Sequence, residues 1–124
     1  MPIQIGGYER VVKHRGNGLE AVFFRWPPGT RTPKHNHRSH GTVWVLEGEV
    51  FEVRNGAKIR YTKGDSFPEI PFSTVHIVGN DSDLVAVTFH IYLPQLAMET
   101  FADDESDYTA IGAFHDGFPS RRRI

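Results

Sequence analysis

The feature that most constrains this chain is a histidine-rich stretch that runs directly into an apolar segment. The stretch is Pro33-Lys34-His35-Asn36-His37-Arg38-Ser39-His40-Gly41-Thr42-Val43-Trp44-Val45-Leu46-Glu47-Gly48. Side chains alternate between the two faces of a β-strand, so His35 and His37 share one face. Two neutral imidazoles on one face can bind the same iron, zinc, copper or nickel ion. An isolated His-x-His pair more often marks two polar residues on a hydrated strand, but the sequence around this pair favours a metal site.

The composition indicates a small globular domain and excludes several kinds of partner. We expect one domain over residues 1–124, because this length suits a single domain and 39% of the residues are hydrophobic. The formal net charge of −1 gives no electrostatic basis for binding nucleic acid or an anionic membrane surface. We find no run of about 18 apolar residues and no signal-peptide pattern. We therefore expect neither a membrane span nor export, and a cytoplasmic location. The chain has no cysteine, so any metal must be held by nitrogen or oxygen.

Short runs rich in Val, Ile, Phe, Tyr and Thr, separated by Pro and Gly, predict an all-β fold. We expect strands over residues 9–13, 20–26, 32–37, 42–46, 50–54, 58–61, 74–78 and 84–93. Asn55-Gly56 predicts a tight hairpin, since a type I′ turn needs positive φ at both central residues, and Gly48 predicts a second one. Eight strands in this order are typical of a double-stranded jelly roll.

The character of the chain changes after Pro94. Residues 95–101 could form one or two helical turns. We expect the acidic side chains that follow to lie on the solvated surface; they are Asp103, Asp104, Glu105 and Asp107. This predicts a barrel core over about residues 8–94 and a small C-terminal tail over residues 95–124 that covers part of it.

Two motifs resemble those of the cupin superfamily. The first is Gly-x5-His-x-His-x3-Gly-x6-Gly, from Gly29 to Gly48, and the second is Gly…Pro…His-x3-Asn, from Gly64 to Asn80. The second is looser, with one extra residue before the proline and Ser73 where a glycine is usual. The resemblance implies the cupin double-stranded β-helix, a jelly-roll barrel that holds a metal.

The second motif contains the third candidate ligand, His76. A single histidine in an apolar run such as residues 75–78 is more often a hydrogen-bonded core residue. The cupin resemblance implies instead that His76 binds the metal together with His35 and His37. His40 is the competing candidate; its strand parity is opposite to that of His37, which otherwise puts it at the rim of a pocket.

Gly41 stands where many cupins have a glutamate ligand. Three neutral histidines leave a divalent ion with its full double charge, and such a site favours an anionic ligand such as a thiolate. Thiol dioxygenases of the cupin superfamily resemble this pattern, with three histidines, iron(II), and glycine or cysteine in place of the glutamate. The resemblance implies Fe(II) as the cofactor; Zn, Ni, Mn and Cu are the alternatives.

Near the N-terminus, Tyr8-Glu9-Arg10 followed by Gly16-Asn17-Gly18 resembles a Tyr-x-Arg…Gly-Asn-Gly segment of cysteine dioxygenases. In that family the arginine binds the substrate carboxylate, and a planar guanidinium suits this role because it pairs bidentately. The resemblance implies that Arg10 and Tyr8 bind substrate. The alternative for Arg10 is a surface position on an edge strand.

A second segment, Thr88-Phe89-His90-Ile91-Tyr92, resembles a Ser-x-His-x-Tyr strand of the same enzymes. There the three side chains form a hydrogen-bonded series that ends with the tyrosine hydroxyl at the iron. Period two places Thr88, His90 and Tyr92 on one face, and the threonine keeps the hydroxyl. The resemblance implies that these three residues are catalytic. This chain lacks the cysteine that the mammalian-type enzymes cross-link to the tyrosine, and the resemblance ends near Pro94.

The opposite face of that strand is apolar, with Val85, Val87, Phe89, Ile91 and Leu93. Hydrophobicity alone would turn it inward, whereas the resemblance turns the polar face into the barrel and the apolar face outward. An exposed apolar face needs a cover, from the tail or from a second subunit. We predict a homodimer, because closed two-fold dimers are the commonest assembly.

These features favour an iron(II) thiol dioxygenase that converts a small thiol, such as cysteine or 3-mercaptopropionate, and O2 to the sulfinic acid. Two alternatives remain, because fold does not fix function. One is a metal-binding cupin of another class, such as an isomerase, a lyase or a carbon-oxygenating enzyme. The other is a non-catalytic cupin that binds a small molecule.

Overall fold

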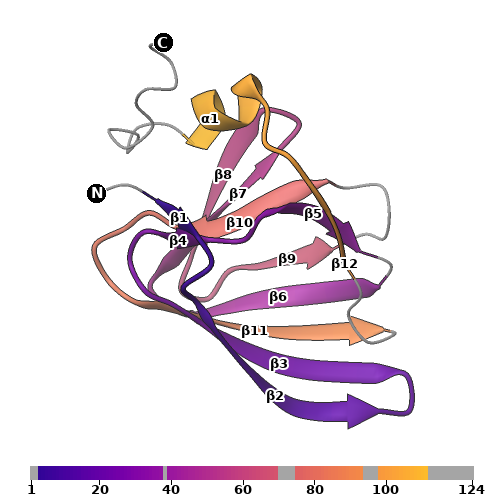
Figure 1. Ribbon diagram of the computed structural model, residues 1–124. Helices are drawn as coiled ribbons and strands as arrows, with labels where there is room; N and C mark the ends of the chain where they lie inside the picture. Colours follow the sequence, from indigo (N-terminus) through magenta and orange to yellow (C-terminus); the bar gives the residue numbers. More distant parts are fainter. Residues whose placement is uncertain (1–2, 38, 70–74, 94–97, 112–124) are drawn as a thin grey trace.

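The protein structure, a computed structural model, describes residues 3–37, 39–69, 75–93 and 98–111. In this part of the chain, twelve strands form two sheets and are followed by one short helix, α1 (Glu105–Ile111; Figure 1). No helical segment among these residues has the length and apolarity that a membrane crossing requires.

One sheet has five strands, and every neighbouring pair is antiparallel. In spatial order its strands are β2 (Glu9–Gly16), β3 (Leu19–Trp26), β11 (Ala86–Leu93), β6 (His40–Glu47) and β9 (Ser66–Glu69). The other sheet has seven strands around a central β10 (His76–Asn80), which pairs with β4 (Thr30–Arg31), β5 (Lys34–His37) and β7 (Glu49–Arg54). Its remaining members are β1 (Gln4–Ile5), β8 (Ala57–Thr62) and β12 (Met98–Phe101).

The predicted all-β jelly roll is confirmed, and each expected strand overlaps an observed one. The two sheets face each other across a common core, whose buried members are Val22, Phe24, Trp26, Val43, Val45, Val50, Phe67, Val78, Ala86 and Tyr92. Four short strands were not predicted: β1, β4, β9 and β12. They have two to four residues each, which is too short for an alternating pattern to be recognised.

The seven-stranded sheet is covered on both faces at β7 and β10. On β7, Val50 belongs to the core between the sheets, whereas Phe51 and Val53 belong to a second cluster with Ile77 and with Ile111 of α1. This explains why the consecutive residues Val50 and Phe51 are both apolar, since a strand buried on both faces has few side chains to expose to solvent.

The C-terminal segment packs differently from the prediction. Of the predicted helical segment 95–101, residues 98–101 form β12, paired with β5, and residues 95–97 lie outside the described residues. The acidic residues are not all on the surface: the side chains of Asp103 and Asp107 are buried, the first against Arg31 and the second 2.9 Å from Nζ of Lys34. Ion pairing with buried or half-buried cations accounts for this burial of charge.

Two glycine turns had been predicted, and the structure supports one of them as a hairpin. Asn55 and Gly56 have φ values of 53° and 75° and connect β7 to β8, as a type I′ turn requires. Gly48 also has positive φ, at 69°, but β6 and β7 lie in different sheets. Gly48 therefore turns the chain from one sheet to the other; a Cβ there would lie 2.7 Å from the carbonyl oxygen of Val85.

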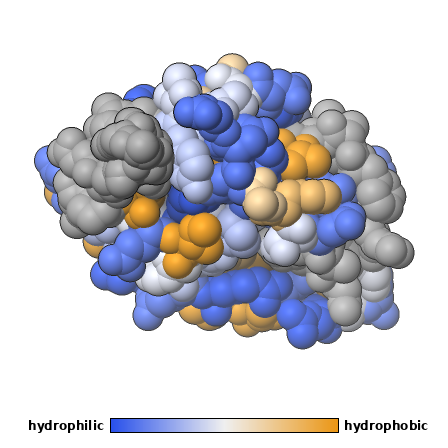
Figure 2. Space-filling model, turned by 45° about the horizontal axis from the view of Figure 1, so that its top comes forward, coloured by the Kyte–Doolittle hydropathy of each residue, from blue (hydrophilic) through white to orange (hydrophobic). Residues whose placement is uncertain are grey.

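The two sides of the molecule differ in polarity. The face that carries α1 is largely hydrophilic, with separate hydrophobic groups (Figure 2). On the outer face of the five-stranded sheet, the ring of Phe89 lies 4.8 Å from that of Phe23 and 5.9 Å from that of Trp44, centre to centre. Val11, the cross-strand partner of Phe23, and Leu93, at the end of β11, are 50% and 49% exposed. The predicted outward orientation of this apolar face is therefore observed.

Candidate metal centre

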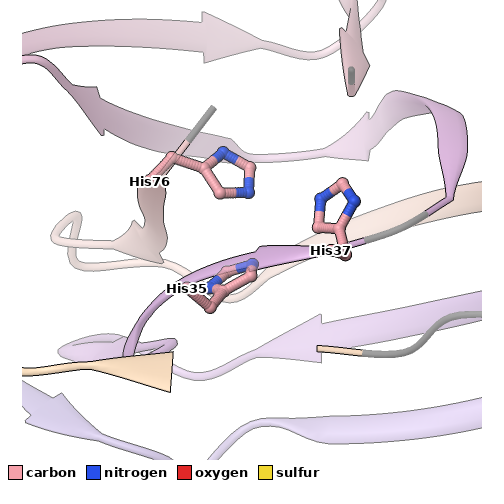
Figure 3. Close-up of side chains that lie close together, drawn as sticks. All are labelled: His35, His37 and His76. Atoms are coloured by element: carbon pink, nitrogen blue, oxygen red, sulfur yellow. The ribbon is translucent and has the colours of Figure 1, made fainter. Parts of the chain in front are cut away.

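Three buried histidines converge between the two sheets (Figure 3). His35 and His37 come from β5, and His76 comes from β10, directly opposite His35 in the antiparallel ladder. Their candidate ligand atoms all lie within 4.8 Å of one another. Period two along β5 and one cross-strand pair are enough to build this cluster. His40 is exposed on β6 and does not belong to it.

The outer ring nitrogen of each histidine already has a partner. Nδ1 of His35 lies 2.8 Å from the carbonyl oxygen of Pro33, and Nδ1 of His37 lies 3.2 Å from that of Ser39. Nδ1 of His76 lies 2.7 Å from Oε2 of Glu52. A carbonyl or carboxylate oxygen accepts, so each Nδ1 donates, and in the tautomer with the proton on Nδ1 each ring turns the Nε2 lone pair toward the centre.

The inward-facing nitrogens fit a divalent transition metal. Nε2 of His37 and Nε2 of His76 are buried and have no hydrogen-bond partner among the described residues. Unpaired lone pairs this deeply buried are costly, and a cation removes that cost. Burial and the neighbouring His76 lower the pKa of His35 to about 4, so this ring is neutral at pH 7, as ligation requires.

A carboxylate that the sequence analysis did not identify lies beside the cluster. Glu69 is 5% exposed, and its carboxylate oxygens are 3.7 Å from Nε2 of His37 and 3.6 Å from Nε2 of His76. Burial raises the pKa of Glu69, but His37 and the other imidazoles outweigh it and hold this pKa at about 2. For His37 the signs are opposite: burial alone lowers the pKa of the ring, but the Glu69 carboxylate outweighs burial, and the pKa of His37 is raised.

The predicted series of Thr88, His90 and Tyr92 points into the barrel. Oγ1 of Thr88 lies 2.6 Å from Nε2 of His90, and Nδ1 of His90 lies 2.7 Å from the Tyr92 hydroxyl. Nε1 of Trp26 donates to Oγ1 of Thr88 at 2.9 Å, which extends the series by one member. The Tyr92 ring lies 6.0 Å from that of His37, so the series ends beside the histidine cluster.

Burial sets the protonation of this series. It lowers the pKa of His90 to about 4, and together with the Glu69 carboxylate it raises the pKa of Tyr92 well above the ordinary tyrosine value. At pH 7 the imidazole is therefore neutral and the phenol keeps its proton.

A cavity of about 70 Å³ connects these groups. Its lining comprises Tyr8, Arg10, Phe24, Trp26, Thr32, His35, Glu69, Val78, His90 and Tyr92. The structure thus places both predicted substrate-binding residues at the cavity. Arg10 is exposed on the edge strand β2, as the alternative for it stated, but it also lines the cavity. It pairs with the buried carboxylate of Glu20, which also accepts from Arg15 at 3.0 Å. The ring of Tyr8 lies 4.7 Å from that of Trp26, centre to centre.

The sequence analysis missed Glu69, Glu52 and Trp26. Strand β9 is four residues long and contains Pro68, which argues against a central strand but is tolerated at the edge that β9 occupies. The buried residues Phe67 and Glu69 alternate with the exposed Ser66 and Pro68, and this period of two was the signal that could have identified the strand. Glu52 lies between the apolar residues Phe51 and Val53, and a charged residue flanked in this way can indicate a buried partner.

Comparisons with known proteins agree with the fold. The structure resembles an uncharacterized conserved protein with a double-stranded β-helix domain from Klebsiella pneumoniae, with a TM-score of 0.69 and 20% identity over 82% of this chain and 91% of that one. It also resembles a cupin 2 domain-containing protein from Halorhodospira halophila, with a TM-score of 0.65 and 18% identity over 83% and 74% of the two chains.

A third similar structure is described as a candidate sugar phosphate isomerase from Acidithiobacillus ferrooxidans, with a TM-score of 0.61 and 18% identity. The match covers 68% of this chain and 56% of that one, so this chain spans little more than half of that protein. A comparison with curated proteins gives no match. The family profile described as "Cupin domain" matches residues 22–92, which is more than half of the chain. The chain therefore belongs to the cupin family.

Proposed function

We propose that this cupin is an iron(II)-dependent thiol dioxygenase that converts a small thiol to its sulfinic acid. The observation that carries the proposal is the series Trp26, Thr88, His90 and Tyr92, which ends beside the three-histidine cluster. His35, His37 and His76 would hold the metal. When bound there, iron(II) would supply the redox chemistry that brings a thiolate and O2 to react.

The reaction balances without a further reactant. A thiol R–SH and O2 give R–SO2H: both oxygen atoms end on sulfur, which is oxidised while O2 is reduced. The protein needs to bind the thiol, orient it, exclude water and keep a proton donor in place. Each of these tasks has a candidate group at the cavity.

Tyr92 is the candidate proton donor. Trp26 donates to the Thr88 hydroxyl, which leaves the hydrogen of that hydroxyl available to Nε2 of His90. In this direction, Nδ1–H of His90 donates to the Tyr92 oxygen, and the Tyr92 hydroxyl hydrogen is directed toward the Glu69 carboxylate at the cavity. Because the pKa of Tyr92 is raised, this hydroxyl remains a donor at pH 7.

Arg10 is the candidate for binding a carboxylate on the thiol. It lines the cavity, and a guanidinium has five N–H donors, so its pairing with Glu20 leaves further donors for a second anion. A cavity of about 70 Å³ favours a short thiol over a bulky one. The aromatic rings of Tyr8, Phe24 and Trp26 exclude water from the same space.

Metal analysis followed by O2 consumption tests the proposal. The iron-loaded protein should consume one O2 per sulfinate formed with cysteine or 3-mercaptopropionate, measured with an oxygen electrode and by mass spectrometry of the product. Tyr92→Phe should reduce kcat by about 10²- to 10⁴-fold, the range for a positioned proton-transfer group, without loss of bound metal. Tyr108→Phe, on α1, is the matched control.

If iron-loaded protein consumes no O2 with any of a panel of small thiols, the proposal is wrong. Turnover of a sugar phosphate or another carbon substrate by the metal-loaded protein would then favour the isomerase, lyase or carbon-oxygenating alternatives.

A further inference from the structure

The buried carboxylate of Glu69 lies beside the three histidines with one of its two oxygens unpaired. Its carboxylate is almost fully buried, and Oε1 has no hydrogen-bond partner among the described residues. The carboxylate faces Nε2 of His37 and Nε2 of His76, and these two buried nitrogens also have no hydrogen-bond partner among the described residues. Three unpaired ligand-type atoms from three strands thus surround one point. A metal ion there would satisfy all three, which no pairwise contact at 3.6 or 3.7 Å does.

The strand register explains how a carboxylate reaches this point. Glu69 on β9 is the direct cross-strand partner of Gly41 on β6. Gly41 occupies the place where the first cupin motif usually carries a glutamate. A Cβ at Gly41 would lie 2.8 Å from the carbonyl oxygen of Ile91 and 2.9 Å from Cδ1 of Tyr92, so no side chain fits there. The ring of Tyr92 takes that space, and the carboxylate arrives from the neighbouring strand instead.

The separations agree with shared coordination. Ligand atoms bound to one ion at about 2.1 Å lie roughly 3.0–3.4 Å apart when they are adjacent in an octahedral or tetrahedral site. Both Glu69–histidine distances are within a few tenths of an ångström of this range. Charge agrees as well, because a divalent ion held by three neutral imidazoles keeps its double charge in a buried site.

We propose that Glu69 is the fourth protein ligand of the metal centre and replaces, from β9, the carboxylate that Gly41 cannot supply. The centre is then His35, His37, His76 and Glu69. This inference rests on the three-histidine cluster and not on thiol oxidation, and Co²⁺ binding tests it separately from O2 consumption. If Glu69 binds the ion, it lowers the charge that three neutral histidines alone would leave for a thiolate.

The test is the binding and the visible spectrum of Co²⁺, titrated into chelator-treated protein. Glu69→Gln keeps the shape of the side chain and removes its charge. We expect it to raise the Kd for Co²⁺ at least tenfold and to alter the d–d absorption bands, with the circular dichroism spectrum unchanged. Glu47→Gln is the matched control, because Glu47 is an exposed residue on β6 paired with Lys63, and it should bind Co²⁺ as the wild type does.

Chemical rescue and infrared spectroscopy give independent readouts. Glu69→Ala opens space for a small anion, so added formate should return the Co²⁺ spectrum toward that of the wild type. In the wild-type protein, the infrared difference spectrum on metal binding should show one carboxylate stretch moving to a metal-coordinated position. A folded Glu69→Gln variant with unchanged Kd and unchanged bands would overturn the proposal, as would a wild-type difference spectrum without that carboxylate shift.

Discussion

Nδ1 of His76 lies 2.7 Å from Oε2 of Glu52, and both side chains are almost completely buried. The carboxylate fixes the tautomer of the ring and makes Nε2 a better donor to a metal. We therefore predict that Glu52→Gln weakens metal binding by about 10- to 100-fold, the usual cost of losing a partner of this kind. Competition with a metal chelator measures the change. Glu49→Gln, three residues earlier on β7, is the control and should bind metal normally, because Glu49 pairs with Arg60 instead.

His76 itself should be indispensable for metal binding. His76→Ala removes one of three imidazoles and should lower metal occupancy sharply, while the β-rich circular dichroism spectrum stays largely intact. The readout is metal content after gel filtration, with His40→Ala as the control that keeps its metal. Full occupancy in His76→Ala would mean that the third ligand is misassigned.

The residues show why the barrel could be predicted and the carboxylates could not. The His35/His37 pair and the Thr88, His90 and Tyr92 face follow from period two along one strand, which is local information. The Glu52–His76 and Gly41–Glu69 pairs depend on which strands become neighbours, and no pattern within β7 or β9 encodes that. Pro68 further hid β9, because the residue usually ends a strand and is tolerated here only at a sheet edge.

Arg10 should distinguish thiols that carry a carboxylate from those that do not. Losing a charge-assisted hydrogen bond costs about 1.5–3 kcal/mol, so Arg10→Leu should raise KM for cysteine or 3-mercaptopropionate more than about tenfold. KM for cysteamine should change little. Steady-state O2 consumption with both kinds of substrate provides the comparison.

The matched control for Arg10 is Arg15→Leu. Both arginines pair with the buried Glu20, but Arg10 lines the cavity and Arg15 does not belong to its lining. Arg15→Leu should leave both KM values nearly unchanged. Equal losses in the two variants would show that the effect passes through Glu20 rather than through contact with substrate.

The stability of the metal-free protein should depend on His90 in mildly acidic solution. Burial lowers the pKa of His90 from 6.5 to about 4 in the folded state. Between these values the unfolded chain binds a proton that the folded chain does not, so the free energy of unfolding falls as pH falls. Between these two values, one such group changes the free energy of unfolding by up to about 1.4 kcal/mol per pH unit. The stability that depends on its neutral form is fully present above pH 6.5 and is lost toward pH 4.

Urea unfolding of chelator-treated protein at pH 7 and pH 5 measures this dependence. His35, whose pKa is lowered in the same way, adds to the gain in stability as pH rises. His37 has a raised pKa and acts in the opposite direction, since its contribution to stability is lost as pH rises. His90→Gln keeps both of those groups, so the difference in slope between wild type and variant isolates His90. Equal slopes would contradict the neutral, buried state of this imidazole.

The outer face of the five-stranded sheet should form a two-fold dimer interface. Phe23, Trp44 and Phe89 make a contiguous aromatic cluster there, and Val11 and Leu93 of the same sheet are exposed. The described part of the C-terminal tail does not cover them, because β12 pairs with β5 and α1 packs on β7 and β8 of the other sheet. Burying a side chain of this size contributes about 1.5–3 kcal/mol, so pairing two such faces is favourable.

Phe89→Glu tests this interface, since it places a charge in the middle of the cluster. Wild-type protein should sediment as a dimer at micromolar concentration. The variant should sediment as a monomer or become insoluble, because the desolvation of an unpaired carboxylate outweighs the gain from the surrounding apolar contacts. Ile5→Glu is the control: Ile5 is equally apolar and 57% exposed, but it lies on β1 of the other sheet, so its replacement should leave the dimer intact. A wild type that sediments as a monomer would contradict the dimer and leave the aromatic cluster without a partner.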